Sequence, residues 1–529
     1  MFRTALIFSI TVFILFPVFS AEKNYRYIIQ QEYRTDTIEY DGVDKTFTRE
    51  RVKVSFSPET YFNYSHVNMN LTENRFTWNF VSSDAVPNLK LLAGNFSVNF
   101  GGGLLSGRKV YLPDDPYQSK IYYSISKTFI PDVSGNPAFS FNGISLSGFT
   151  AWKDFRFSAH AFYSIRPRYI SDDPFVSTAT DSTLKSTALK LNYDYLNRFP
   201  VIINDTGTMF ELKYLNFSSQ FYFIYSDIKS GEEFILWDYN TNPFRTGGVK
   251  HYLGYGTFSK YEDDYLVLFG EASGTSRCFS SNGEDSQWVN GFGAQFGIVY
   301  KHPVFKMKIA GKYSGEDFYA PYGSTGTGSE SRWHAGGDFK INRNFSTGVS
   351  VEASKNLAPS SFYSILYSSR RVEYFLKFNF MNRFIIQGKL NFISRDAEYG
   401  TDESRQFKIK IKNALNKNFY AEISAVYQNS SAADSFSAGI GTGLRISFFN
   451  ADINYSFYNI SGDNYIYSII DPMPYSVASG SFIRSSMSAF TARIFLKFDK
   501  GSFVIRYQTQ FNYSSVIGNR LELIGRINI

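Results

Sequence analysis

The feature that most constrains the fold is a regular alternation of apolar and polar residues in short runs separated by turns. It is clearest in the stretch Arg371–Arg395, where two such runs flank the turn Met381-Asn382-Arg383. Every second residue is apolar in Val372–Phe380, and the same holds in Phe384–Phe392 apart from Gly388. Successive side chains of a strand point to opposite faces, and a turn this short joins antiparallel neighbours. The stretch therefore predicts a β-hairpin with one apolar face.

The amino-acid composition suits a sheet that lies in a membrane. The 529 residues include 54 Phe and 39 Tyr, yet the mean hydropathy is only −0.23. Beyond the N-terminus no run approaches the roughly 18 apolar residues of a membrane-spanning helix. A strand that crosses a membrane interleaves lipid-facing and polar residues, so its average hydropathy stays low.

The predicted fold class is therefore all-β, a single large antiparallel transmembrane β-barrel. Counting the alternating runs gives about 22–26 strands, and an even number is expected for a bacterial single-chain barrel. A sheet in lipid has to close, because every unpaired edge group would cost several kcal/mol. No separate plug domain is expected, since no segment has the length for one.

The N-terminus predicts export from the cytoplasm. Residues 1–20 read as a signal peptide, with Arg3 in the basic region, an apolar core in Ala5–Phe16 and a cleavage site before Ala21. Residues 21–45 are polar and are expected to form a short periplasmic lead-in. Residues 46–529 are expected to form the barrel, in the outer membrane of a Gram-negative bacterium.

A recurrent turn combines Asn, a cation and Phe. Asn tolerates left-handed backbone angles, and Phe suits the aromatic girdle of a membrane barrel. The last three copies begin 40 and 34 residues apart, a spacing that holds two strands, a short turn and a longer loop. The turns are Asn74-Arg75-Phe76, Asn197-Arg198-Phe199, Asn342-Arg343-Asn344-Phe345, Asn382-Arg383-Phe384 and Asn416-Lys417-Asn418-Phe419. The longer connections, expected as extracellular loops, are Ser106–Gln118, Pro167–Thr183, Ser314–Ser331 and Ser461–Ser481.

One early segment, Leu91–Leu104, reads LLAGNFSVNFGGGL. From Gly94 onward it resembles the G-(D/N)-(Y/F)-x-x-x-F-G-x-G-L segment of Bacteroidetes-type outer-membrane β-barrels that often carry helix-hairpin-helix repeats. Those repeats are absent here. The resemblance implies an outer-membrane barrel and assigns no activity to individual residues. The run Gly101-Gly102-Gly103 lacks the Lys-Ser/Thr of a phosphate loop and predicts a strand end or a kink where backbones approach closely.

The polar faces of the alternating runs provide the functional residues. If the apolar faces meet lipid, the charged residues between them are expected to line the lumen, where mixed charge can tune selectivity. The candidate lumen-lining residues are Lys377, Lys389, Lys408, Lys410, Lys412, Arg506, Arg526, Glu373, Glu422 and Glu522.

A wide barrel with a polar inner face favours passive transport, as a porin-like channel for an unknown solute. Barrels of this size hold either a channel or a plug, so the alternative is that loops fold inward. The other hypotheses are a non-conducting scaffold or receptor barrel in a surface or envelope-assembly complex, and an outer-membrane hydrolase.

The remaining sequence features bear on chemistry and partners. The His residues show neither metal-ligand nor HExxH spacing, so the chain is predicted not to be an enzyme, and no metal or cofactor is expected. Lys and Arg are scattered, which argues against a nucleic-acid partner. Outer-membrane lipid and the barrel-assembly machinery are the expected partners, and a periplasmic or surface protein partner stays open.

Overall fold

The structure is a computed structural model of the chain. It describes residues 26–38, 43–57, 59–69, 73–86, 88–106, 128–132, 141–171, 198–230, 248–280, 287–318, 320, 329–357, 367–380, 383–397, 400–430, 434–461, 466–470, 479–483, 486–512 and 515–528. The expected signal peptide lies outside the described residues.

Within the described residues the fold is all-β, as predicted, and no helix there is long and apolar enough to cross a membrane. The strands are β1 (Arg26–Ile38), β2 (Val43–Ser55), β3 (Tyr61–Met69), β4 (Glu73–Val86), β5 (Leu89–Val98), β6 (Phe129–Pro131), β7 (Phe141–Trp152), β8 (Phe155–Ser171), β9 (Arg198–Tyr214), β10 (Phe217–Ser230), β11 (Gly248–Glu262), β12 (Leu266–Ser280), β13 (Gln287–Lys301), β14 (Phe305–Ser314), β15 (Glu330–Lys340), β16 (Phe345–Asn356), β17 (Tyr367–Phe380), β18 (Phe384–Ala397), β19 (Gly400–Ala414), β20 (Phe419–Ser430), β21 (Asp434–Ile446), β22 (Phe449–Asn459), β23 (Ile466–Ile470), β24 (Ser479–Ile483), β25 (Met487–Phe498), β26 (Gly501–Asn512) and β27 (Ser515–Asn528).

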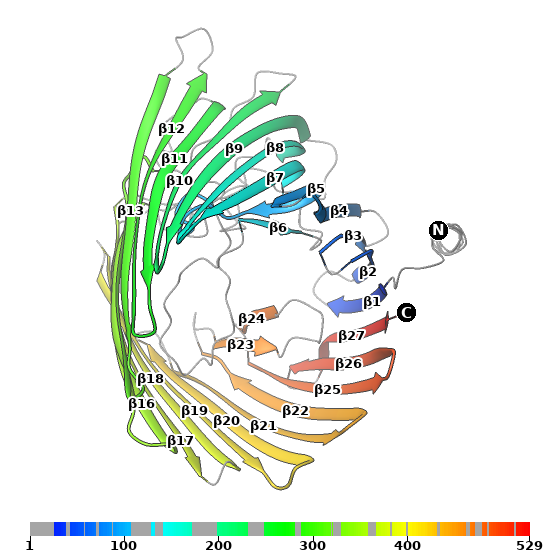
Figure 1. Ribbon diagram of the computed structural model, residues 1–529. Coiled ribbons are helices and arrows are strands. Elements are labelled where there is room, and N and C mark those ends of the chain that lie inside the picture. The colour runs from blue at the N-terminus through cyan, green and yellow to red at the C-terminus, as the bar shows by residue number, and fades with distance from the viewer. Residues whose placement is uncertain are drawn as a thin grey trace, which may run out of the picture.

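One large antiparallel sheet contains all strands except the hairpin β23–β24. It has 25 strands, and 24 remain without the short strand β6, which pairs with β5. Each of these 24 strands pairs with the strands before and after it in the sequence. Because β23 and β24 form a separate sheet, β22 pairs with β25. The last strand lies beside the first, with β27 paired to β1 from Ile28↔Asn528 to Ile38↔Gly518 (Figure 1). The predicted strand number, even and between 22 and 26, is confirmed.

The start of the sheet corrects the predicted domain boundary. The segment expected as a lead-in contains β1, which pairs with β2 on one side and β27 on the other. The sequence hides this strand because Gln31 interrupts the apolar set formed by Tyr27, Ile29 and Tyr33. The sheet therefore begins at Arg26 instead of residue 46.

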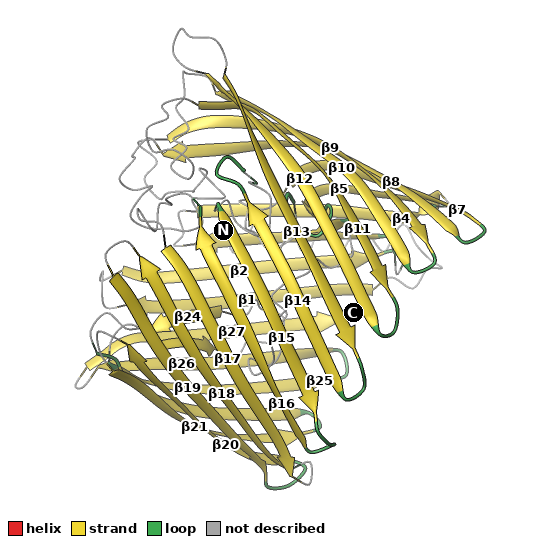
Figure 2. Ribbon diagram, turned by 90° about the vertical axis from the view of Figure 1, so that its left-hand side faces the viewer, coloured by secondary structure: helices red, strands yellow, loops and turns green. Residues whose placement is uncertain are grey.

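Short connections gather at one end of the strands, which we call the short-turn end (Figure 2). Asn342 and Asn416 lie in two of these turns, as predicted. The side-chain oxygen of Asn416 accepts hydrogen bonds from the backbone N–H groups of Asn418 and Phe419, at 2.8 Å each. Asp263 makes the same two bonds in the β11–β12 turn, and they hold the pKa of its carboxyl below the usual value.

Two of the predicted Asn turns are wrong. Asn74 and Arg75 lie inside β4, where Asn68 faces Asn74, so the chain has already turned before them. Arg198 is the first residue of β9 and pairs with Ser171, so it lies at the end opposite to the short turns. Both misassignments arise because Asn before a cation and Phe is as compatible with the beginning of a strand as with a turn.

The structure supports a simple prediction about the turns. Replacing Asn416 with Ala removes two hydrogen bonds to the backbone, and the expected loss in the free energy of unfolding is roughly 1–2 kcal/mol. The measurement is denaturant unfolding of the detergent-solubilised protein. Lys417→Ala, at the exposed neighbour in the same turn, is the control and should change stability by less than about 0.5 kcal/mol. Equal stability of the two variants would contradict the assigned role of Asn416.

The longer connections are confirmed in part. The expected loop at Ser314–Ser331 corresponds to the link between β14 and β15. The expected loop at Ser461–Ser481 instead contains β23 and the beginning of β24, which form their own two-stranded sheet. Residues 167–171, expected in a loop, still belong to β8. Most of the other two expected loops, residues 107–118 and 172–183, lies outside the described residues.

The strands present an exposed apolar face, which we call the outer face; the opposite face is the inner face. In β17, Tyr374 and Leu376 are 48% and 44% exposed, while Phe375 between them is only 7% exposed. Phe210 and Phe221 lie opposite each other in β9 and β10 and are 61% and 60% exposed. The alternation predicted from the sequence is thus observed, with large apolar side chains directed away from the packed side of the sheet.

Candidate functional site

A segment of the chain leaves the wall and folds onto the inner face. Up to Phe96, β5 pairs with β7, but its last residues pair with β6 instead. Residues 99–106, which we call the inward segment, continue from there. Phe100, Leu104 and Leu105 in this segment are all 0% exposed. In Figure 1, β6 lies on the concave side of the wall that β4, β5, β7 and β8 form.

The inward segment packs on aromatic residues of the wall. The ring of Phe100 lies 5.9 Å from that of Phe162 on β8 and 6.1 Å from that of Tyr222 on β10. The rings of Phe96 and Phe141 stack at 5.9 Å. These residues belong to the largest buried apolar cluster of the described chain. The apolar core of the protein is therefore a contact between an inserted segment and one side of the wall.

The carboxylate of Glu271 on β12 holds the glycine run in place. It accepts hydrogen bonds from the backbone N–H of Gly102, at 3.1 Å, and of Leu104, at 3.3 Å. The hydroxyl of Tyr222 and the side-chain amide of Gln295 also donate to it. Glu271 is only 4% exposed. A buried carboxylate is costly unless several donors satisfy it, so this arrangement fixes the segment at one place on the wall.

The glycines are required by space. A side chain at Gly101 would overlap the Glu271 carboxylate and lie 2.8 Å from a ring carbon of Tyr222, and the backbone φ of +66° disfavours other residues. A side chain at Gly254 would lie 3.2 Å from Leu105. The predicted strand end is confirmed, because β5 ends at Val98. The close approach at Gly101 is to the side chains of Glu271 and Tyr222 and not, as predicted, to another backbone.

A second segment folds onto the same cluster from the β14–β15 connection. Phe318 and Ala320 are 1% and 0% exposed and belong to the same buried cluster as Phe100. A side chain at Gly293 on β13 would lie 2.9 Å from the Phe318 ring. The guanidinium of Arg277, which is 0% exposed, donates to the backbone oxygen of Asp317 at 3.2 Å. The interior beside β8–β13 is thus filled by two parts of the same chain.

The predicted lumen-lining residues all lie on the inner face by the alternation of their strands, and the structure brings several together. Lys389 pairs with Glu373 at 3.1 Å, and Lys410 with Glu422 at 2.8 Å. Arg506 and Glu522 face each other across β26 and β27 and form an ion pair. The remaining predicted members of the set lie on β17, β19 and β27. Lys412, on β19, lies 4.2 Å from the centre of the Tyr420 ring on β20. These members are Lys377, Lys408, Lys412 and Arg526.

Several inner-face residues were missed by sequence reasoning. Lys308 pairs with Asp338 at 3.3 Å, and Lys312 with Glu330 at 2.6 Å. The alternation in β14 could have identified these two lysines. They share one face of the strand with Lys306, and the apolar residues Met307 and Ile309 lie on the other face. No comparable signal marked Glu271, because its role depends on a segment that is distant in the sequence.

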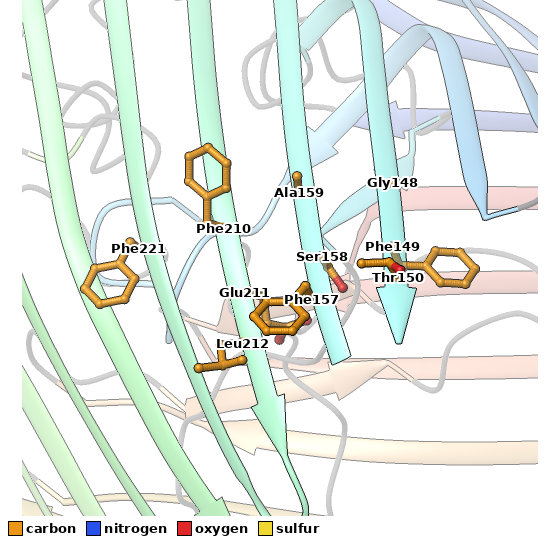
Figure 3. A pocket seen from close by; sticks show the side chains of 10 residues that line it. All are labelled: Gly148, Phe149, Thr150, Phe157, Ser158, Ala159, Phe210, Glu211, Leu212 and Phe221. Atoms are coloured by element: carbon orange, nitrogen blue, oxygen red, sulfur yellow. The ribbon is translucent and has the colours of Figure 1, made fainter. Parts of the chain in front are cut away.

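The outer face has a shallow apolar hollow near the short-turn end of β7–β10. It has a volume of about 410 Å³ and lies around Ala159 and Gly148, the smallest residues of the lining. Phe157, Phe210 and Phe221 flank it, as Figure 3 shows. The hollow is a gap between large outer-face rings and is continuous with that face.

The described residues offer little for chemistry. They contain no cluster of three or more His, Cys, Asp or Glu residues that could hold a metal ion. Cys278 is a buried free thiol on β12. The polar groups of the inner face are instead arranged in ion pairs and hydrogen bonds, an arrangement suited to contact with water or a polar solute.

Comparisons with known proteins find similar structures. The chain is similar to the siderophore receptor PirA from Pseudomonas aeruginosa, with 7% identity, a TM-score of 0.49 and coverage of 96% of this chain and 81% of that chain. It is similar to the FrpB iron transporter (F3-3 variant) from Neisseria meningitidis, with 8% identity, a TM-score of 0.45 and coverage of 96% and 82%. It is also similar to the P pilus usher (PapC) translocation pore, with 8% identity, a TM-score of 0.44 and coverage of 95% of this chain and 99% of that chain. No family model and no curated protein matches the sequence.

Proposed function

We propose that the protein is an outer-membrane β-barrel that transports a small polar solute. The observation that carries the proposal is the opposite chemistry of the two faces of the large sheet. Large apolar side chains such as Phe210 and Ile423 are exposed on the outer face, whereas ion pairs such as Lys389–Glu373 lie on the inner face. An exposed apolar surface that follows the strands around the sheet is stable in hydrocarbon and unfavourable in water.

The pairing of β27 with β1 supports the same proposal. It supplies partners for the backbone groups of the first and last strands, which a sheet in lipid requires. In this arrangement the short turns are periplasmic and the longer connections extracellular. Among the described residues, the inward segment, Phe318 and Ala320 narrow the interior.

Conductance of the full chain in planar lipid bilayers tests the transport proposal. We expect the protein to sediment with outer membranes, to resist carbonate extraction and to give stepwise conductance in salt. Heat-denatured protein from the same preparation is the control. A protein that is found in outer membranes but gives no conductance in any salt or solute would overturn transport.

A second candidate function follows from the filled side of the interior. If the two inward parts seal the barrel, the protein is a non-conducting scaffold or receptor. The buried contacts of Phe100, Leu105 and Phe318 favour this candidate. It predicts stable co-purification of a protein partner from native membranes together with absence of conductance, whereas the transport proposal predicts conductance by the purified protein alone.

A further inference from the structure

A cavity lined by both polar and apolar residues lies on the inner face directly beside the inward segment. Its volume is about 310 Å³, and residues at the short-turn end of β9–β12 form its wall. Asn99 and Gly101 of the inward segment border it from the other side. This volume falls within the roughly 300–1,000 Å³ of small-molecule sites.

The strand register arranges the wall of this cavity in two rows. In the first row Gln220 on β10 faces Glu211 on one side and Phe258 on the other. In the second row Ser218 on β10 faces Lys213 and Lys260. Polar donors, polar acceptors and an aromatic ring therefore lie side by side across the adjacent strands β9, β10 and β11.

The charges of the cavity wall are already neutralised by one another. Lys213 pairs with Glu211 at 3.2 Å, and Lys260 pairs with Glu262. Gln220 donates to Glu211 at 2.8 Å and accepts from the backbone N–H of Gly101 at 3.1 Å. The two cations and two carboxylates of the lining cancel. An ion of either sign would have to compete with an existing partner, whereas a hydroxyl group can join these pairs as both donor and acceptor.

One side of the cavity is apolar. The rings of Phe258 and Phe269 lie 6.5 Å apart. Phe258 belongs to the buried apolar cluster, and Phe269 packs against it. Val267 extends this surface and is 5% exposed. A ligand of this cavity therefore needs an apolar face for the rings and several polar edges for the opposite wall.

We propose that this cavity binds a neutral polyhydroxylated solute of the size of a mono- or disaccharide. A sugar ring combines a C–H face, which packs on the two Phe rings, with hydroxyl groups that hydrogen-bond to the paired Lys and Glu side chains and to Gln220. The inference rests on the proposed transport function, because it names the substrate class. Binding itself does not require conductance.

Calorimetric titration of the full chain in detergent micelles tests the proposal, with glucose and sucrose as probes. Potassium phosphate and glycine are the charged and zwitterionic comparison probes. Ser218→Phe fills the cavity from the middle of its wall, and Ser219→Phe places the same ring on the outer face of the same strand. We expect Ser218→Phe to weaken sugar binding about tenfold or more, equivalent to 1.4 kcal/mol, and Ser219→Phe to leave it unchanged.

Lys260→Met provides a second variant if Ser218→Phe fails to fold, since it keeps the apolar stem and removes the donor; it should also weaken sugar binding. The proposal would be overturned if the wild-type protein gave no heat of binding with either sugar, or if it bound phosphate or glycine more tightly than sugar. Equal sugar affinity of the Ser218→Phe variant and the Ser219→Phe control would also overturn it. Conductance is measured separately. A conducting protein that binds no sugar refutes only this inference, whereas a sugar-binding protein without conductance refutes only transport.

Discussion

Replacing Gly101 with Ala is expected to displace the inward segment and to open the barrel. The added methyl group would overlap the Glu271 carboxylate, which cannot move aside because Tyr222, Gln295 and two backbone N–H groups hold it. The left-handed backbone at Gly101 adds roughly 1–2 kcal/mol of strain, and forcing a group into a packed site costs roughly 1–3 kcal/mol. We expect lower stability and larger conductance steps than in the wild type.

Gly270→Ala is the matched control for this prediction. Gly270 precedes Glu271 in β12, and a side chain there would meet no described atom within 4 Å. Both variants are compared in planar bilayers and in denaturant unfolding. Gly270→Ala should match the wild type in conductance and unfolding midpoint. If Gly101→Ala also matches the wild type in both, the inward segment does not restrict the barrel.

Replacing Glu522 with Ala is expected to cause the largest loss of stability. Glu522 and Arg506 form an ion pair whose side chains are 5% and 4% exposed, next to the buried cross-strand pair Val504 and Ile524. Removing one member of a buried pair leaves a costly charge in a water-poor site, and such changes typically cost about 3–5 kcal/mol. Denaturant unfolding of the refolded protein in lipid vesicles measures the loss.

An exposed ion pair of the same sheet serves as the control. Arg405 and Glu403 lie 3.9 Å apart, and their side chains are 67% and 64% exposed. Glu403→Ala should change the free energy of unfolding by no more than about 1 kcal/mol, because water screens such pairs. A loss at Glu522 as small as that at Glu403 would show that water reaches the Arg506–Glu522 pair.

The fold was largely predictable because one periodicity runs through most of the chain. Alternation from Val372 to Phe380 already defines which side chains are exposed, and the Asn342 and Asn416 turns follow from local hydrogen bonding. The sequence-based predictions were wrong where that periodicity is weak. Gln31 masks the apolar set of β1, and the turn motif at Asn74 occurs inside a strand.

The candidate site was predictable only in part, for a physical reason. The face on which charged residues such as Lys389 and Glu373 lie can be read from the alternation of their own strands. The contact between Gly102 and Glu271 joins residues 169 positions apart, and no local pattern encodes it. The glycine run did mark a place of close approach, although the wall side chains that it meets, such as Glu271 and Tyr222, could not be inferred from sequence.

A membrane-spanning barrel requires that the outer face meet hydrocarbon, and spin labelling tests this contact most directly. Nitroxide labels are placed at Ile423, which is 56% exposed, and at its neighbour Ser424 on the inner face, after Cys278 is replaced by Ser. In lipid vesicles the label at residue 423 should be accessible to oxygen and protected from a water-soluble nickel complex, and the label at residue 424 should show less preference for oxygen. Free access of the nickel complex to residue 423 would contradict the membrane-spanning barrel and the transport proposal built on it.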